Sequence, residues 1–191
     1  MDTKELEQFF QETWASRAAR CMTKIKDRED KRNVRSFRSY DDIIEHLIND
    51  PDEPFPDSVL EELSMIRPRL VEFRDFSKIF AEKLGPKLDP SLFWGLMGTL
   101  VVAAQIEGDA TRRMTQEIKK LSRNVETLRG YSTAGEDLSN KAKEAVFETF
   151  VVATNFFADA IEFLRDEEHF ARSRSAGSLE TPRRYLRNNL S

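Results

Sequence analysis

Residues able to do chemistry are few and scattered along this chain of 191 residues. It has one cysteine, Cys21, and two histidines, His46 and His169, whose separations fit no familiar zinc-binding spacing. Glu45 beside His46, and the two acids before His169, are more typical of a solvated helix surface. The sequence also lacks a glycine-rich phosphate loop ending in Gly-Lys. We therefore expect no catalytic residue, metal, cofactor or small-molecule substrate, and we expect that the chain is not an enzyme.

The single cysteine and the N-terminal residues indicate in which cellular compartment the protein is expected. One cysteine excludes an internal disulfide framework and fits a reducing environment. The first residues, Met-Asp-Thr-Lys-Glu-Leu-Glu, contain no apolar signal region. The sequence therefore predicts a cytoplasmic protein. Cys21 itself falls on a predicted buried stripe, which favours inert packing over nucleophilic work.

The elements that position these side chains are organised around the segment between Asp89 and Glu107, which holds 17 residues without a charge. Asp89 can cap a helix whose first residue is Pro90, and the segment predicts a helix over 90–107. Because this helix is apolar on every side, we expect it to be the core of a bundle rather than a membrane span. Gly95 and Gly98 would let a neighbouring backbone approach closely. The predicted core residues of this helix are Trp94, Leu96, Met97, Leu100, Val101 and Ala104.

Three further long helices are predicted, over 58–84, 110–129 and 136–170. Pro68 should kink the first of them or split it near Arg67. In the last, the apolar side is broadened enough to touch two neighbours, by Phe147, Val151, Val152, Phe156 and Phe163. Together with the central helix, these segments predict an all-α fold, an antiparallel four-helix bundle with an additional N-terminal amphipathic helix.

That N-terminal helix is predicted over residues 3–25, with apolar residues at steps of three and four. Residues 26–39 hold few large apolar side chains and are expected to be a loop or a fraying helix end. A short helix over 43–48, capped by Ser39 or Asp41, is expected next, before a proline-rich break. The candidate interaction or insertion face of the N-terminal helix consists of Leu6, Phe10, Trp14, Met22 and Ile25.

Charge is distributed unevenly although the net charge is only −4. Residues 17–38 hold nine Lys or Arg against three Asp or Glu, a net charge of +6, and residues 41–62 hold nine acids and no Lys or Arg. These two stretches could attract each other within one molecule or between two. The chain thus divides into an N-terminal region over 1–56, a helical bundle over 57–170 and an Arg/Ser-rich tail or linker over 171–191. No affinity for nucleic acid is expected.

One family resemblance rests on the central segment, Leu88-Asp-Pro-Ser-Leu-Phe-Trp-Gly-Leu-Met-Gly-Thr-Leu-Val-Val-Ala-Ala-Gln. With the helices that follow, ending in Ile161-Glu-Phe-Leu-Arg165, it resembles the N-terminal helical domain of fungal STAND/NLR-like proteins. The resemblance covers roughly 57–168, and its most specific element is Phe93-Trp94-Gly95 after Asp89-Pro90. It implies a signalling or effector module of innate immunity or programmed cell death, distantly similar to four-helix executioner domains. Such a module would precede a NACHT-type NTPase, and the tail would be the start of the linker.

Two functions remain open at this point. In the first, the domain is a non-catalytic module that acts by protein–protein interaction or self-assembly. In the second, it is a membrane-acting executioner that inserts its N-terminal or central helix on activation. The N-terminal helix carries Glu5, Glu7 and Glu12 among its basic residues, which is unusual for a helix that lies on a membrane. We therefore favour a detachable N-terminal helix that docks or dimerises over one that inserts.

Overall fold

The computed structural model describes residues 2–49, 57–85, 88–104, 112, 115–123, 125–126 and 138–175, and every regular element among them is an α-helix. The all-α class is therefore confirmed. Residues 115–123 and 125–126 are helical and lie between α5 and α7 in the sequence. The labelled helices are α1 (Thr3–Lys24), α2 (Arg28–Ser36), α3 (Tyr40–Asn49), α4 (Asp57–Leu84), α5 (Ser91–Ala104) and α7 (Asn140–Ser175).

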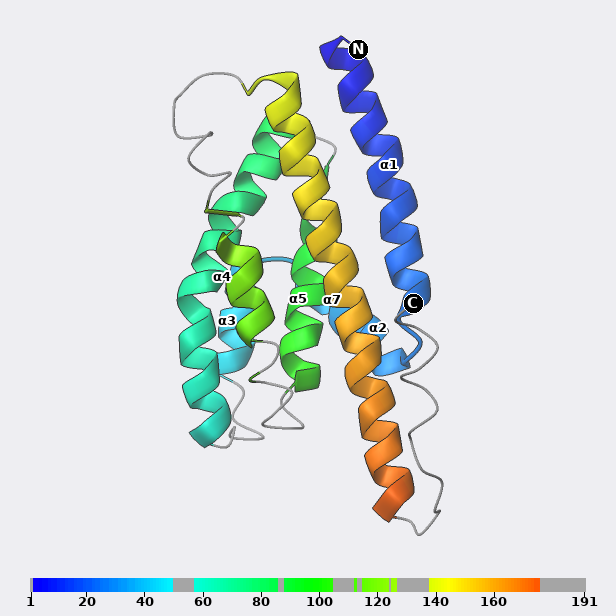
Figure 1. Ribbon diagram of the computed structural model, residues 1–191, viewed down its shortest axis with the longest axis vertical. Helices are drawn as coiled ribbons and strands as arrows, with labels where there is room; N and C mark the ends of the chain where they lie inside the picture. Colours follow the sequence, from blue (N-terminus) through cyan, green and yellow to red (C-terminus); the bar gives the residue numbers. More distant parts are fainter. Residues whose placement is uncertain are drawn as a thin grey trace.

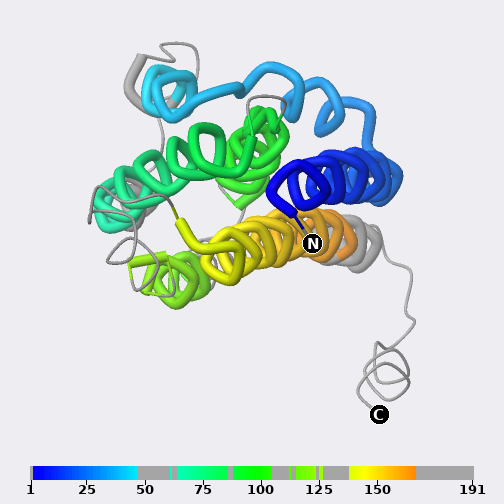
Figure 2. The backbone as a smooth tube through the Cα atoms, turned by 90° about the horizontal axis from the view of Figure 1, so that it is seen from above, coloured from blue at the N-terminus to red at the C-terminus, as the bar shows by residue number. Residues whose placement is uncertain are grey.

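The long helices lie side by side, with α5 inside the molecule. In Figure 1, α1 and α7 run in the same direction, and α4 runs opposite to α5. Seen from above in Figure 2, α2 and α3 lie along one side of α5, and α7 lies along the other. The apolar helix α5 is thus enclosed between α2 and α7, which explains why it can be apolar around its whole circumference.

Helix α5 forms the centre of the core. Its six predicted core residues, at 94, 96, 97, 100, 101 and 104, are all buried. The carboxylate of Asp89 accepts hydrogen bonds from the Ser91 N–H at 2.9 Å and the Ser91 hydroxyl at 2.7 Å, so the predicted cap is present. Residues 105–107, where the prediction ended this helix, lie outside the described residues. Across the described ranges, no helix has both the length and the apolar character that a membrane crossing needs.

The expected loop or fraying end over 26–39 is wrong, because Arg28–Ser36 form α2. Two features stabilise this short helix. Asp27 caps it by accepting hydrogen bonds from the backbone N–H groups of Glu29 and Asp30. Val34 and Phe37 are also buried against the core. A segment with only two large apolar side chains therefore folds, since both of them reach the core.

Two glycines of α5 create the space into which α2 packs. A Cβ atom on Gly95 would lie 2.1 Å from the backbone oxygen of Val34. A Cβ atom on Gly98 would lie 2.4 Å from ring atoms of Phe37. The close backbone approach predicted for these glycines is confirmed at Gly95, while Gly98 accommodates an aromatic ring. Gly95 and Gly98 together form what we call the glycine notch.

The ends of the outer helices differ in part from the predictions. Ser39 does cap α3, because its hydroxyl accepts from the Asp42 N–H while the Asp42 carboxylate accepts from the Ser39 N–H. Helix α4 is continuous through Pro68, so of the two outcomes predicted there, a kink or a split near Arg67, the split does not occur. Helix α7 continues to Ser175, and residues 171–175 therefore belong to a helix rather than to the tail or linker. The remainder of that tail, 176–191, lies outside the described residues.

Candidate functional site

The candidate face of the N-terminal helix lies mostly inside the molecule. Leu6, Phe10 and Ile25 are fully buried, Trp14 is buried and Met22 is partly buried. The ring of Phe10 stacks on Phe147 of α7, with the centroids 4.5 Å apart. This candidate interaction or insertion face is thus covered by the protein's own core. Whether α1 can detach stays a prediction.

Trp14 connects α1 to two other elements of the fold. Its ring lies 5.3 Å from that of Phe80 on α4 and 5.5 Å from that of Phe150 on α7. Its indole N–H donates a hydrogen bond of 3.2 Å to the backbone oxygen of Asp89, the residue that caps α5. A buried indole needs such an acceptor, and here the acceptor belongs to the start of the central helix.

Ion pairs fasten the end of α1 and the start of α2 to one side of α7. Three residues of α7 at steps of three take part, namely Asp159, Glu162 and Arg165, which pair with Lys24, Lys26 and Asp30 respectively. The backbone N–H of Lys26 also donates to Glu162 at 2.9 Å. We call these contacts the polar clasp. The sequence did not reveal these pairs, because the partners are more than 130 residues apart and only the fold brings them together.

The Asp30–Arg165 pair is the buried member of the polar clasp. Asp30 is 0% exposed and the Arg165 side chain 18% exposed. The guanidinium binds the carboxylate through two bonds, Nε to Oδ2 at 2.8 Å and Nη2 to Oδ1 at 2.6 Å. Such a two-point contact fixes orientation as well as distance, so it sets how α2 lies against α7.

Cys21 is buried and has the properties of a structural residue. Its thiol lies 3.4 Å from the Asn155 side-chain oxygen on α7, to which it donates a hydrogen bond. Burial raises the pKa of this thiol above its ordinary value of 9.0, although nearby Lys24 opposes the shift. Since the thiolate is the reactive form, this environment supports the expected inert packing role.

Of the two histidines, the structure describes the side chain of His46 only. His46 is partly buried, and its ring packs edge-on against Phe37 at 5.3 Å. The side chain of His169 lies outside the described residues. In the part of the chain that the structure describes, no three His, Cys, Asp or Glu side chains lie close enough together to hold a metal ion.

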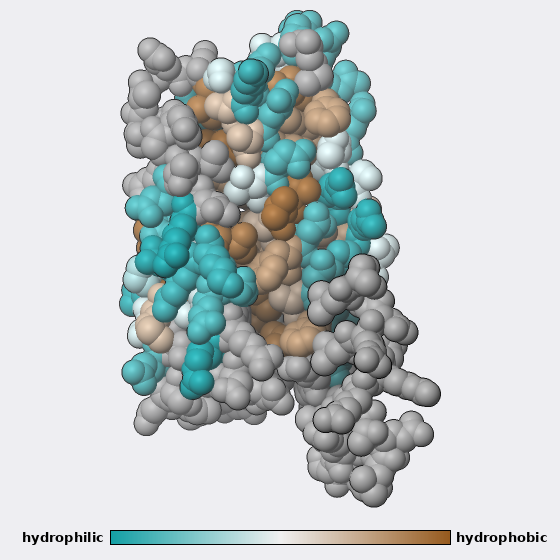
Figure 3. Space-filling view, in the orientation of Figure 1, coloured by the Kyte–Doolittle hydropathy of each residue, from teal (hydrophilic) through white to brown (hydrophobic). Residues whose placement is uncertain are grey.

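An apolar stripe on the outer side of α7 is left uncovered. Val152 is 57% exposed and Phe163 is 50% exposed, while Phe156 between them is partly buried. These three residues, which we call the α7 stripe, fall on one helix face. Figure 3 shows apolar side chains gathered along the middle of this side of the molecule, over α7. The apolar side of α7 does reach two neighbours, since Phe147 packs against Phe10 of α1 and Phe80 of α4, but Val152 and Phe163 lie on an exposed part of it.

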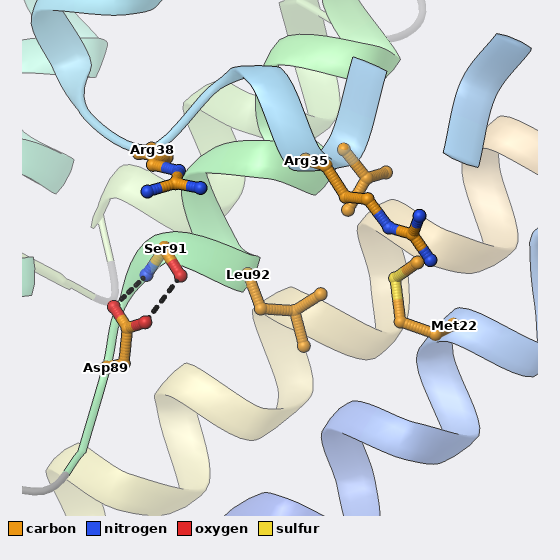
Figure 4. A pocket seen from close by; sticks show the side chains of 7 residues that line it. Met22, Arg35, Arg38, Asp89, Ser91 and Leu92 are labelled. Atoms are coloured by element: carbon orange, nitrogen blue, oxygen red, sulfur yellow. Dashed lines mark hydrogen bonds between the residues drawn. The ribbon is translucent and has the colours of Figure 1, made fainter. Parts of the chain in front are cut away.

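A second surface feature is an open pocket of about 620 Å³ where α1, α2 and α5 meet (Figure 4). Its apolar lining comes from Met22, Val34 and Leu92. Its polar lining consists of Arg35 from the last turn of α2, Arg38 just after that helix, and Asp89 and Ser91 at the start of α5. In Figure 4 the Arg35 side chain extends toward Met22, and the Arg38 guanidinium lies on the side of Ser91. This pocket was not predictable from the sequence, because residues 26–39 were expected to be irregular.

Comparison with protein-family models, with curated proteins and with solved structures finds no match to this chain.

Proposed function

We propose that this protein is a non-catalytic signalling or effector module of an NLR-like protein, acting in the cytoplasm by protein–protein contact or self-assembly. The resemblance of residues 57–168 to the N-terminal domains of fungal STAND proteins supports the class. The α7 stripe is the observation that best supports action by protein–protein contact or self-assembly. Within the described residues, the buried chemistry is structural, and two of the four exposed large apolar side chains belong to the α7 stripe.

The composition of the α7 stripe supports a role in protein contact. Large apolar side chains that are half exposed on one helix face are more favourable against a partner than against water. Phe163 and Phe156 provide aromatic groups, which are common anchors in interfaces. Asp159, whose side chain is 62% exposed, lies among them, three residues after Phe156 and four before Phe163. The exposed surface of α7 thus combines apolar and charged side chains, as protein–protein interfaces do.

For the architecture, we propose an up-down-up-down four-helix bundle to which α1 is added as a fifth long helix. The bundle would consist of α4, α5, the helical residues within 112–126, and α7. The opposite directions of α4 and α5, and the shared direction of α5 and α7, support this arrangement (Figure 1). Signalling bundles of this kind would present one face of one helix to the next molecule.

The test is to place a charge on the α7 stripe and measure the oligomeric state of the full chain. We expect wild-type protein to show a mass that rises with concentration in light scattering, and Val152→Glu and Phe163→Glu to remain monomeric. Met65→Glu is the matched control, because Met65 is 40% exposed but lies on α4. Circular dichroism would check that each variant is folded. Equal association by all four proteins would contradict the proposal.

The membrane-acting reading is the alternative outcome of that experiment. Its apolar candidate face on α1 is buried against α4 and α7, so insertion would first require α1 to leave the core. Leakage from anionic vesicles by wild-type protein, with no self-association in their absence, would favour this alternative over assembly.

A further inference from the structure

We propose that the pocket between α1, α2 and α5 binds a small amphipathic anion, a phosphate or carboxylate group that carries an apolar chain. This inference is independent of the α7 stripe and of the interaction function proposed above. It revises the expectation that the chain has no small-molecule ligand.

The pocket lining contains two arginines, which lie on different sides of it, Arg35 near Met22 and Arg38 near Ser91 (Figure 4). Both Arg35 and Arg38 are exposed, and within the described part of the chain neither guanidinium has an ion pair or a side-chain hydrogen bond. Guanidinium groups bind phosphate and carboxylate oxygens through paired N–H donors. Asp89 is the one acid in the pocket lining, and both of its carboxylate oxygens already accept hydrogen bonds from Ser91. The net charge of the lining therefore favours an anion.

The backbone that carries the arginines is held in place. Arg35 follows Val34, whose backbone oxygen packs against Gly95, and Arg38 follows Phe37, whose ring packs against Gly98. The Arg38 N–H also donates to the Asp42 carboxylate at 2.7 Å. At the other end of α2, the buried Asp30–Arg165 pair joins the helix to α7. Because the backbone is fixed before binding, less ordering of the protein is needed when an anion binds.

The apolar part of the lining determines what the anion is attached to. Met22 and Leu92 are partly buried and line the pocket together with buried Val34. A methionine thioether and two aliphatic side chains offer no specific polar contact, and they suit an alkyl or acyl chain. The volume of about 620 Å³ falls within the range of roughly 300–1,000 Å³ typical of small-molecule sites. An inorganic anion alone would leave this apolar lining unused.

The experiment is a titration of the full chain, with methionine methyl groups labelled with ¹³C and observed by NMR. The chain has five methionines, and Met22 lines the pocket while Met97 is buried in α5. We expect octyl phosphate, below its micelle concentration, to shift the Met22 signal and to leave that of Met97 in place. Inorganic phosphate should bind at least tenfold more weakly. An unmoved Met22 signal, or equal affinities for the two phosphates, would overturn the proposal.

Variants then test the arginines. Arg35→Gln and Arg38→Gln should each weaken octyl phosphate binding about tenfold, the effect expected for losing one charge-assisted contact. Arg32→Gln is the matched control, since Arg32 is exposed on the same helix but does not line the pocket. If it weakened binding as much as the other two, the effect would come from the general basic charge of α2, and the proposed site would be wrong.

The source of the anion is distinguished by vesicles. Sedimentation with vesicles of phosphatidylcholine, with and without phosphatidic acid, tests whether a lipid headgroup reaches the pocket. Binding that needs phosphatidic acid and is lost in Arg35→Gln and Arg38→Gln supports the proposal with a lipid as ligand. Octyl phosphate binding without vesicle binding supports it with a soluble amphiphile as ligand.

Discussion

At the scale of single residues, the buried thiol of Cys21 gives a prediction about pH. Burial raises the pKa of the folded-state thiol above 9.0, whereas the unfolded chain ionises at the ordinary value. Above that value the folded state therefore holds more protons than the unfolded state. The contribution of Cys21 to stability is complete below about pH 9 and is lost as the pH rises through the folded-state pKa.

We therefore expect the stability advantage of wild type over Cys21→Ala to shrink between pH 8 and pH 10.5 in urea unfolding. Subtracting the unfolding free energy of the variant from that of wild type removes the contributions of the lysines and tyrosines that titrate in the same pH range. A difference in unfolding free energy that does not change with pH would contradict this account.

The Asp30–Arg165 pair carries a second prediction at this scale. Removing one partner of a buried ion pair leaves a charge without compensation, which typically costs about 3–5 kcal/mol. Asp30→Asn should destabilise the protein by about 3 kcal/mol. This value is at the low end of that range because the Arg165 side chain is 18% exposed and water can partly solvate its charge. The double variant Asp30→Leu/Arg165→Met should be more stable than the sum of its single variants predicts.

One of the two exposed pairs of the polar clasp is the control for that experiment. The Lys24–Asp159 pair has side-chain exposures of 31% and 62%, and surface pairs are typically worth about 0–1 kcal/mol. Lys24→Met should thus change stability by less than about 1 kcal/mol. If the two pairs cost the same to break, burial would not be the feature that distinguishes them.

At the scale of elements, the glycine notch determines whether α2 can pack on α5. Glycine to alanine normally stabilises a helix interior by about 1 kcal/mol. Gly95→Ala should instead destabilise by about 3 kcal/mol, since the new methyl group would meet the backbone of Val34 at 2.1 Å. Gly98→Ala should cost less, because the obstacle is the side chain of Phe37, which has more freedom to move than backbone.

A second substitution separates the two glycines. Phe37→Leu should reduce the additional cost of Gly98→Ala, because a smaller side chain leaves room for the methyl group. The same substitution should not reduce the cost of Gly95→Ala. Urea unfolding of the single and double variants measures both couplings. If Phe37→Leu reduced the cost of Gly95→Ala and of Gly98→Ala equally, the two glycine positions would not be independent, and the notch would deform as one unit.

The same elements show what the sequence could and could not predict. Helices α1 and α4 were predictable because their apolar residues recur at helical spacing, and α5 because an uncharged run follows the capping Asp89 and Pro90. Helix α2 was not, since its stability depends on Val34 and Phe37 reaching the glycine notch some 60 residues later. The exposure of Val152 and Phe163 was equally hidden, because hydropathy does not reveal which side of α7 lacks a neighbour. The pocket depended on α2 and was missed with it.

At the scale of the whole molecule, the question is whether α1 leaves the core during function. Burial of a large apolar side chain contributes roughly 1.5–3 kcal/mol, and Leu6, Phe10, Trp14 and Ile25 are all buried. Their combined contribution, on the order of 6–12 kcal/mol, is comparable to the total stability of a typical domain. Unassisted release of α1 should therefore be about as rare as global unfolding, and any release in function needs a partner or trigger.

A disulfide between α1 and α7 tests this directly. The Cys21 thiol lies 3.4 Å from the side-chain oxygen of Asn155, and it is the only thiol in the chain, so Asn155→Cys can pair only with it inside one molecule. We expect the oxidised variant to self-associate as wild type does, because the α7 stripe stays accessible while α1 is locked. Asn155→Ser controls for the lost hydrogen bond, and thiol titration confirms that the lock has formed. If oxidation abolished association and reduction restored it, α1 would have to leave the core for assembly, and the α7 stripe alone would not explain the interaction.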